Sequence, residues 1–494
     1  MAKRDHNASY THILKYTGLF GGVQGLNTLV GLVRNKLVAL ILGPDGMGLM
    51  SLFSSTIKLA SDSTNFGIGM SGVKTVASAY DEHDEQSLNR RIRLIRSWSV
   101  LAALLGMTLC IVLSPLLNFS TFSWGNHTLH FVLLSPVVAM LAITSGESAV
   151  LKATHQLKAL AAVSVLNTLL ALVTSIPLYY FFGQAGIVPS LLVIALTQML
   201  LTLSFSFRYY PLSLSFRRKD LRAGLGMIKL GLAFVAAGIM GSGADFLIRS
   251  YLNTAGSLDT VGLFNAGYMM TMVYAGLVFS AMETDYFPRL SGLHGSRQTF
   301  NVTVNHQIEV SILIVAPLLV AFIIAQPILL PLLYSGKFLP AMRMIQVMIL
   351  AMYLRAIKLP VAYIPLAKGD SKSYMLMESI YDVVLVLLVV VGYRLWGLTG
   401  TGIAITGAAL FDFVMLNVYM HWRYGYSMSK TVSLYCAIQI PLGLLAFGLT
   451  FMHEGAVYWI LGGLLTVVSL AISLRILHQK TGLWTAIRSK LTHR

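Results

Sequence analysis

Residues Asn27–Tyr80 read NTLVGLVRNKLVALILGPDGMGLMSLFSSTIKLASDSTNFGIGMSGVKTVASAY. Two long apolar runs are joined by the segment Leu42-Gly-Pro-Asp-Gly, whose composition is typical of a sharp turn. Four ionic side chains lie inside the runs rather than at their ends: Arg34, Lys36, Lys58 and Asp62. Charges within membrane-length helices are costly against lipid and usually line a path for something polar. The stretch therefore predicts a helical hairpin beside a polar pathway.

The composition of the whole chain is that of a polytopic membrane protein. Apolar residues make up 56% of the 494 residues and charged residues only 11%, whereas a soluble domain carries about 25% charged residues. Lys and Arg number 36 against 19 Asp and Glu. Basic cytoplasmic loops explain this excess, and no nucleic-acid-binding motif accompanies it. Cys110 and Cys436 both fall in apolar runs, so we expect neither a disulfide nor a metal site.

Apolar stretches of spanning length predict an all-α fold with about 14 transmembrane helices. They lie at roughly 11–42, 46–76, 93–118, 128–153, 159–182, 186–208, 224–250, 261–289, 306–335, 340–366, 374–394, 400–422, 431–452 and 456–477. We expect two six-helix lobes and two further helices: an N-terminal lobe at 1–210, a cytoplasmic linker at 211–223, a C-terminal lobe at 224–425, and helices 13 and 14 with a basic cytoplasmic tail at 426–494.

A weak internal repeat supports two lobes of parallel orientation. Lys15 and Arg34 recur at nearly the same spacing as Lys229 and Arg249, and the opening Gly48-Leu of one helix recurs as Gly262-Leu. Repeated halves are common in transporters, with the substrate site between them. We therefore expect Lys36 and Lys58 to face Arg249 of the opposite lobe.

The distribution of basic residues predicts the orientation of the chain. With a cytoplasmic N-terminus, the outward loops hold only Lys337 and Arg394, and all other basic loop residues face inward. Because cytoplasmic loops collect Lys and Arg, both termini are expected in the cytoplasm. The short outward loops leave no room for an external domain.

The charges within the predicted spans need partners or a wet cavity, since each would cost about 2.5–3.5 kcal/mol against lipid. Lys58 with Asp62, and Asp245 with Arg249, are spaced four residues apart and can neutralise each other on one helix face. Arg355 has only another cation, Lys358, beside it in sequence. Acids from another helix can compensate these cations, or bind a coupling cation instead: Glu378, Asp382 and Asp412.

Five segments, in this order, resemble the Wzx-type O-antigen and enterobacterial-common-antigen flippases, which form a polysaccharide-transporter branch of the multidrug/oligosaccharidyl-lipid/polysaccharide (MOP) exporter superfamily. They are Leu42-Gly-Pro-Asp-Gly-Met-Gly-Leu-Met, Phe66-Gly-Ile-Gly-Met-Ser-Gly-Val-Lys-Thr-Val-Ala, Asp259-Thr-Val-Gly-Leu-Phe, Tyr286-Phe-Pro-Arg-Leu-Ser and Ser335-Gly-Lys-Phe-Leu-Pro-Ala-Met-Arg. The similarity extends from about residue 12 to residue 422, and residues 431–477 continue past the twelve helices of the enterobacterial-common-antigen flippases.

This resemblance implies a MATE-like transporter of the bacterial inner membrane with two lobes around a cationic cavity. It implies that alternating access moves an undecaprenyl-pyrophosphate-linked oligosaccharide repeat unit to the periplasmic leaflet, for O-antigen and lipopolysaccharide biosynthesis. The implied partners are this lipid, membrane lipids, a glycan polymerase and a chain-length regulator. The ionic residues that match the family are Lys36, Arg249, Lys358, Lys368 and Glu378.

The residues themselves suit such a substrate. Lys and Arg in a hydrated cavity can replace the water around a pyrophosphate. The candidate substrate-binding residues are Arg34, Lys36, Lys58, Arg249, Arg355 and Lys358; the candidate gating or coupling residues are Asp62, Asp245, Glu378, Asp382 and Asp412; and the candidate aromatic walls for sugars are Tyr268, Tyr274, Tyr353 and Tyr363.

Three alternatives stay open. A peptidoglycan-precursor flippase needs the same cationic cavity, and a cation-coupled multidrug exporter of the same superfamily should favour acids. A membrane glycan polymerase or ligase would need a sizeable external loop, which the chain lacks. No phosphate-binding glycine loop or HExxH motif is present, so we expect no enzyme activity and no cofactor. Whether transport is coupled to an ion, and to H⁺ or Na⁺, stays open.

Overall fold

The computed structural model describes residues 2–82, 84–122, 125–276, 278–279, 286–287, 289–293 and 297–481, so the basic tail at 482–494 lies outside the described residues. The described part is almost entirely helical and contains no strand. Its main helices are α1 (Ala2–Thr64), α2 (Ile68–Asp81), α3 (Glu85–Val112), α4 (Ser114–Thr121), α5 (Thr128–Ala153), α6 (Leu157–Phe182), α7 (Ile187–Tyr209), α8 (Arg218–Ala255), α9 (Leu258–Tyr268), α11 (Arg297–Ile324), α12 (Gln326–Leu333), α13 (Met342–Ala367), α14 (Ser371–Tyr424), α15 (Lys430–Leu449) and α16 (Ala456–Thr481).

Nine of the described helices are long and apolar enough to cross a membrane. Three of them are 43 to 54 residues long, at least twice the roughly 20 residues that one crossing needs. Leu157–Tyr209 and Ser371–Tyr424 each contain two predicted spans, and Gly22–Thr64 contains parts of two. The chain is therefore an all-α multi-pass membrane protein, as predicted. The count of 14 spans stays a prediction.

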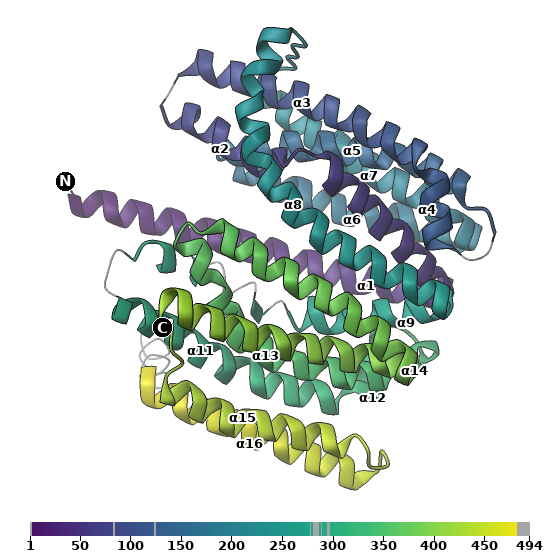
Figure 1. Cartoon of the computed structure of the whole chain (residues 1–494), viewed down its shortest axis with the longest axis vertical. Helices are drawn as coiled ribbons and strands as arrows, with labels where there is room; N and C mark the ends of the chain where they lie inside the picture. The colour runs from purple at the N-terminus through teal and green to yellow at the C-terminus, as the bar shows by residue number, and fades with distance from the viewer. Residues whose placement is uncertain are drawn as a thin grey trace, which may run out of the picture. The chain divides into compact units, whose positions relative to one another are not determined.

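The chain divides into two compact units (Figure 1). Unit 1 comprises Met1–Gly262 with Leu333–Ser335, and unit 2 comprises Leu263–Leu332 with Gly336–Arg494. In unit 1, α8 packs on α1, α2, α3 and α4, although the sequence analysis assigns this helix to the C-terminal lobe. The compact units thus differ from the expected lobes in the placement of α8, and the lobe boundaries stay a prediction.

The turn predicted at residues 42–46 is a kink within α1. Gly43 adopts φ 68° and ψ −171°, outside the helical region, and Pro44 follows it. A residue with a Cβ is strained at this positive φ, and proline cannot donate a hydrogen bond to the preceding turn. The pair therefore separates the two apolar runs without a loop.

The second predicted span, 46–76, is broken rather than continuous. Phe66 and Gly67 have φ values of 52° and 65°, and the break separates α1 from α2. A Cβ on Gly67 would lie 2.4 Å from the carbonyl oxygen of Gly231 on α8. The apolar periodicity of the span does not indicate this break. The close backbone contact with α8 is a tertiary feature that periodicity does not report.

The segments around Gly48 and Gly262, which the internal repeat relates, contact each other reciprocally. A Cβ on Gly48 would lie 2.0 Å from the carbonyl oxygen of Leu258, and a Cβ on Gly262 would lie 1.9 Å from that of Pro44. Pro44 lies four residues before Gly48, and Leu258 lies four residues before Gly262, so the contacting carbonyls occupy equivalent positions in the two copies. The repeated glycines are thus required by a close backbone approach.

We expect Gly48→Ala to lower stability by about 1–3 kcal/mol, the usual cost of overpacking, since the obstructing atom belongs to the backbone. Gly31→Ala is the matched control on α1, because a Cβ there meets nothing within 4 Å and alanine favours the helix by about 1 kcal/mol. Thermal unfolding of both variants in detergent checks this. Equal midpoints for the two variants would contradict the close approach.

Unit 1 also contains a buried ion pair between α3 and α5. Arg96 donates from Nε to Oε1 of Glu147 at 2.8 Å and from Nη2 to Oε2 at 3.1 Å. It further donates to the carbonyl oxygens of Tyr210 and Pro211 at 2.9 and 2.7 Å, and Ser206 donates to Glu147. Arg96 is only 3% exposed, and its bonds to Tyr210 and Pro211 fix the start of the 211–217 connection.

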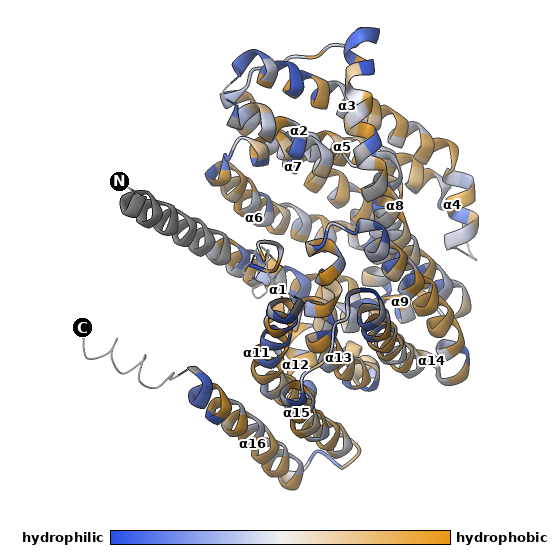
Figure 2. Cartoon of the chain, turned by 60° about the vertical axis from the view of Figure 1, so that its left-hand side comes forward, coloured by the Kyte–Doolittle hydropathy of each residue, from blue (hydrophilic) through white to orange (hydrophobic). Residues whose placement is uncertain are grey.

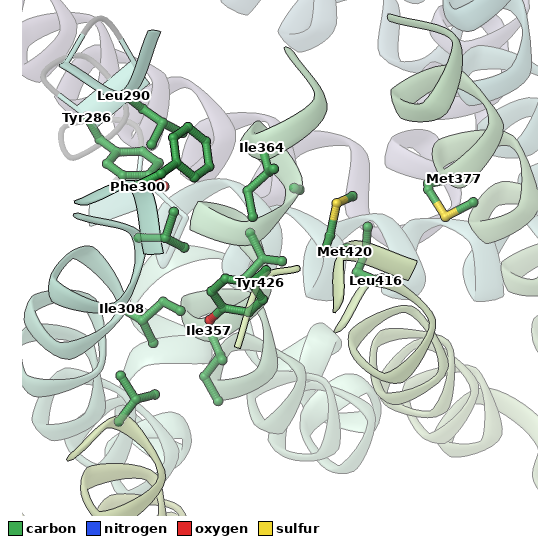
Figure 3. Packing of buried hydrophobic residues seen from close by; sticks show 14 residues of the cluster. Tyr286, Leu290, Phe300, Ile308, Ile357, Ile364, Met377, Leu416, Met420 and Tyr426 are labelled. Atoms are coloured by element: carbon green, nitrogen blue, oxygen red, sulfur yellow. The ribbon is translucent and has the colours of Figure 1, made fainter. Parts of the chain in front are cut away.

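In unit 2, α13 packs on α14, and α11 packs on α13, α15 and α16. Their buried apolar side chains form one cluster that includes Ile308 on α11, Ile357 on α13 and Met420 on α14 (Figure 3). Tyr426, after α14, fills the same cluster and is 2% exposed. This core holds the helices that carry the charged residues of unit 2.

The two halves of α14 are antiparallel neighbours because Trp396 and Gly397 leave the helical region between them. Their far ends meet at Asp370, which caps the helix by accepting from the Ser373 amide at 3.1 Å. Asp370 also accepts from the hydroxyls of Ser373 and Tyr424, each at 2.8 Å. These hydrogen bonds, led by that of Tyr424, lower the pKa of the Asp370 carboxyl.

The folded-state pKa of Asp370 thus lies below that of the unfolded chain, which is about 3.9. Its stabilising contribution is therefore fully present above that unfolded pKa and is lost as the pH falls through the lower folded value. We expect Asp370→Asn to remove this acid dependence below about pH 4, while Glu85→Gln, an exposed position, leaves it intact. Unfolding midpoints between about pH 3 and pH 7 measure it; parallel curves for wild type and Asp370→Asn would contradict it.

Candidate functional site

A pocket of about 280 Å³ lies within unit 2, between α9, α13 and α14. It brings together three predicted site residues, Arg355, Lys358 and Glu378. The two cations lie on α13 one turn apart, and Glu378 lies on the first half of α14. Packing of α13 against α14 thus creates a charged pocket inside helices that are otherwise apolar.

Lys358 forms an ion pair with Asp412 on the second half of α14. The side chains of Lys358 and Asp412 are only 16% and 3% exposed, and the ammonium also lies 4.7 Å from the ring centroid of Tyr381. Compensation by acids from another helix is one of the two roles predicted for Glu378, Asp382 and Asp412. Among them, the direct partner is Asp412, 54 residues away, rather than Glu378 or Asp382.

Arg355 contacts a widened turn of helix. Residues Met269–Tyr274 form a π-helical turn after α9, and Arg355 donates from Nη1 to the carbonyl oxygen of Met272 at 3.4 Å. The guanidinium also lies 5.5 Å from the ring centroid of Phe279. Such turns occur frequently at functional sites because they redirect carbonyl groups out of the helical ladder. The predicted span 261–289 is therefore not a regular helix over its described part.

Tyrosines make up much of the pocket wall. Tyr268 and Tyr363, both predicted, line it, and so do Tyr374 and Tyr381, which the sequence analysis misses. Tyr353 is placed elsewhere: it is 2% exposed and its hydroxyl donates to the carbonyl oxygen of Ala316. Tyr353 therefore belongs to the packing of α13 on α11. Tyr274 lies in the π-helical turn, outside the pocket lining.

Of the acids described near this pocket, Glu378 lines it, while Asp382 and Asp412 lie close to the charged residues of its wall. Glu378 lies within electrostatic reach of Lys358, Asp412 and Arg355. Asp382, one turn further along α14, lies within reach of Glu378 and Lys358. Two cations and three acids therefore share one region, so this part of the chain is not a simply cationic cavity.

Unit 1 holds a second group of predicted site residues. Arg249 on α8 is 6% exposed and forms an ion pair with Asp245, as its spacing predicts. Its Nε donates to the hydroxyl of Ser51 on α1 at 2.7 Å. Ser51 precedes Lys58 by seven residues, so both lie on nearly the same face of α1. The expected orientation of Lys58 toward Arg249 stays a prediction.

Lys58 and Asp62, whose spacing allows an intrahelical pair, form no salt bridge among the described residues. Lys58 is exposed in unit 1, and within the described part of the chain it lies only within electrostatic reach of Asp62. Asp62 instead lies near Ser242 on α8 and lines a pocket of about 130 Å³ beside Asn65 and Gly67. The broken helix end, rather than the i,i+4 partner, determines the surroundings of Asp62.

The remaining predicted cations are spread over different places. Arg34 donates from Nε to the hydroxyl of Ser175 on α6 at 3.1 Å, and Lys36 is half-buried on α1. Lys368 follows the last turn of α13, with its ammonium 4.5 Å from the ring centroid of Phe300. Neither Arg34 nor Lys368 lines the pocket at Lys358.

Comparison with known proteins adds a family and a fold. A family model described as polysaccharide biosynthesis protein matches residues 37–343. No curated protein sequence matches the chain significantly. The lipid II flippase MurJ, in an inward-closed conformation, superposes with a TM-score of 0.69 at 14% identity, over 94% of this chain and 99% of that one.

Two further solved structures have the same fold. A multidrug resistance MATE-family transporter of the MOP superfamily, in an inward-facing conformation, gives a TM-score of 0.66 at 16% identity, over 81% of this chain and 94% of that one. A MOP-superfamily transporter from Pyrococcus furiosus with a binding pocket of reverse polarity gives 0.59 at 15%, over 83% and 96%. At these identities the similarity establishes the MOP-superfamily fold alone. The family model matches more than half of the 494 residues of this chain, and the chain therefore belongs to the polysaccharide biosynthesis protein family.

Proposed function

We propose that this protein is a flippase that moves an undecaprenyl-pyrophosphate-linked oligosaccharide from the cytoplasmic to the periplasmic leaflet of a bacterial inner membrane. Within that role it serves O-antigen or another surface polysaccharide, as a transporter rather than an enzyme. Both termini would lie in the cytoplasm, with a glycan polymerase and a chain-length regulator as later partners.

The observation that carries this proposal is the pocket at Arg355 and Lys358. It combines two cations with four tyrosines inside membrane-spanning helices. Arg and Lys bind phosphate oxygens strongly where water is scarce, and tyrosine offers both an apolar ring and a hydroxyl. These are the groups that a pyrophosphate and its attached sugars require.

The ion pair of Lys358 with Asp412 gives such binding a mechanism. An arriving pyrophosphate competes with the Asp412 carboxylate for the same ammonium. Asp412, once released, is left buried and must take up another cation or a proton. Substrate binding and cation uptake thus become linked through one lysine, without any cofactor.

The three acids supply the coupling in this proposal. Glu378, Asp382 and Asp412 together outnumber the two nearby cations, Arg355 and Lys358. Asp412 is paired with Lys358, so Glu378 and Asp382 are the groups we assign to H⁺ or Na⁺. Asp245 is engaged by Arg249 in unit 1 and serves there to orient that guanidinium. We assign three further cations to the substrate path: Arg34, Lys36 and Lys58. Asp62 is assigned a gating role.

The surplus of acids also favours a second candidate, a cation-coupled exporter of cationic drugs. A cationic drug would take the place of the missing positive charge beside Glu378 and Asp382. A peptidoglycan-precursor flippase shares the phosphate chemistry of the first candidate and differs only in its glycan. Lipid analysis separates all three.

The test is deletion of the gene followed by analysis of lipid-linked sugars. We expect one undecaprenyl-linked oligosaccharide to accumulate and its polymer to disappear from the cell surface, both reversed by the wild-type gene. Accumulation of the peptidoglycan precursor would point to the third candidate. A normal lipid-linked pool combined with altered drug sensitivity would refute the flippase.

A further inference from the structure

A second, larger pocket lies in unit 2 where α11 begins, α14 ends, α15 begins and α16 ends. Its volume is about 660 Å³, and nine of its eleven described lining residues carry polar or charged side chains. It shares no lining residue with the pocket at Lys358. A pocket lined mainly by polar side chains is suited to binding a polar ligand.

The pocket lies at the level where the apolar parts of its helices end. Residues 297–309 of α11 are largely polar and residues 310–324 are apolar. The apolar part of α16 likewise gives way to His478, Gln479 and Lys480, and Figure 2 shows this end of the helix as hydrophilic. At such a boundary along a membrane helix, the surrounding bilayer changes from its hydrocarbon core to its headgroup region.

Asn305 on α11 holds the connection between α14 and α15 in place as part of the pocket wall. Its side-chain amide donates to the carbonyl oxygen of Ser427 at 3.0 Å, and its carbonyl accepts from the Ser429 amide at 2.8 Å. Asn301 donates to the carbonyl oxygen of Gly425 at 3.2 Å. Asn305 is 6% exposed, so these bonds fix the connection before any ligand arrives.

Hydrogen-bond donors and one ion pair face this pocket. Ser429 caps α15 by accepting from the Val432 amide at 3.1 Å. Thr431, in the first turn of α15, lines the pocket, where backbone amides without a helical partner favour an anion. Lys480 of α16 also lines it and is paired with Glu309 of α11, whose side chain is 7% exposed.

We propose that this pocket binds the headgroup of a phosphatidylethanolamine molecule. The lipid phosphate takes Lys480, the Thr431 hydroxyl and the start of α15, while the ammonium takes Glu309. The headgroup carries one charge of each sign, so its insertion exchanges one internal ion pair for two intermolecular ones. A purely anionic ligand would instead leave Glu309 beside added negative charge.

A lipid fits better than free phosphate because apolar surface continues from the pocket. Only 17% of the most apolar window of α16 is buried, and Leu470 and Leu474 near its polar end are 45% and 43% exposed. Acyl chains can therefore cover α16 while the headgroup occupies the pocket. This inference does not depend on the transported substrate.

The test uses the full-length protein in detergent and native mass spectrometry with added phosphatidylethanolamine or phosphatidylcholine. We expect wild type to retain phosphatidylethanolamine about tenfold better, because a trimethylated ammonium cannot donate a hydrogen bond to Glu309. Glu309→Gln/Lys480→Met, which removes both charges together, should abolish this preference. Lys430→Met removes an exposed charge at the same end that does not line the pocket, and should preserve it.

Three outcomes would overturn the proposal. These are equal retention of both lipids by wild type, an unchanged preference in the double variant, and displacement of the lipid by millimolar inorganic phosphate. Thermal unfolding shows whether the double variant folds. If it does not, Thr431→Val, which removes one hydroxyl at nearly constant volume, should still weaken phosphatidylethanolamine retention, and unchanged retention in that variant would equally refute the site.

Discussion

Arg96→Met is expected to lower the stability of unit 1 by about 3–5 kcal/mol, the cost of breaking a buried ion pair on one side. The side chains of Arg96 and Glu147 are 2% and 4% exposed, so solvent cannot replace the lost partner. The substitution also leaves the carbonyl oxygens of Tyr210 and Pro211 without this donor. Unfolding of the purified protein in detergent measures the loss.

Arg93→Met is the matched control for this prediction. Arg93 lies on the same helix, nearly one turn earlier, and is exposed, so its loss should change stability by no more than about 0.5 kcal/mol. Arg96→Lys should recover only part of the loss, because an ammonium cannot reproduce the two parallel bonds to Glu147. Equal effects of Arg96→Met and Arg93→Met would show that the buried network contributes nothing.

Lys358→Met is expected to reduce both protein stability and surface-glycan assembly, the latter by at least tenfold. It leaves Asp412, whose side chain is 3% exposed, as an unpaired buried charge, which costs about 3–5 kcal/mol. Lys358→Met/Asp412→Asn removes both charges, so protein level should recover. Glycan assembly should stay low in the double variant, because the cation proposed to bind pyrophosphate is still missing.

The separation of the two effects decides the role of Lys358. Protein level in membranes and polymer at the cell surface are measured for both variants, with Lys372→Met as an exposed control on α14. Recovery of both quantities in the double variant would mean that the pair only stabilises the fold. It would then remove Lys358 from the proposed substrate path.

Several helices could be predicted closely because their apolar length is a local property. The span 128–153 coincides with α5, and 456–477 lies within α16. The breaks were less predictable. Pro44 signals the kink at Gly43. The interruption at Phe66 and Gly67 falls inside the predicted span 46–76, and the close contact of Gly67 with the backbone of α8 is a tertiary feature.

The pocket at Lys358 shows the same division. Charged residues within apolar helices identified Arg355, Lys358 and Glu378 as neighbours of a polar site. Their pairing could not be predicted, because Asp412 and Glu378 lie on two halves of one helix that fold against each other at Gly397. The choice of tyrosines depends equally on which face of α13 packs on α11.

By itself, the sequence determined the membrane class, the helical content and the residues that a bilayer would not tolerate without partners. These follow from composition and local spacing, because transfer into hydrocarbon penalises each polar group wherever it stands in the chain. Only the tertiary structure decided that Lys358 pairs with Asp412, that Arg96 is buried against Glu147, and that Gly48 meets the backbone of Leu258. Those partners lie tens to hundreds of residues apart in sequence. A buried charge requires some partner, and a closely packed glycine requires some neighbouring backbone, but the local sequence does not show which residue supplies it.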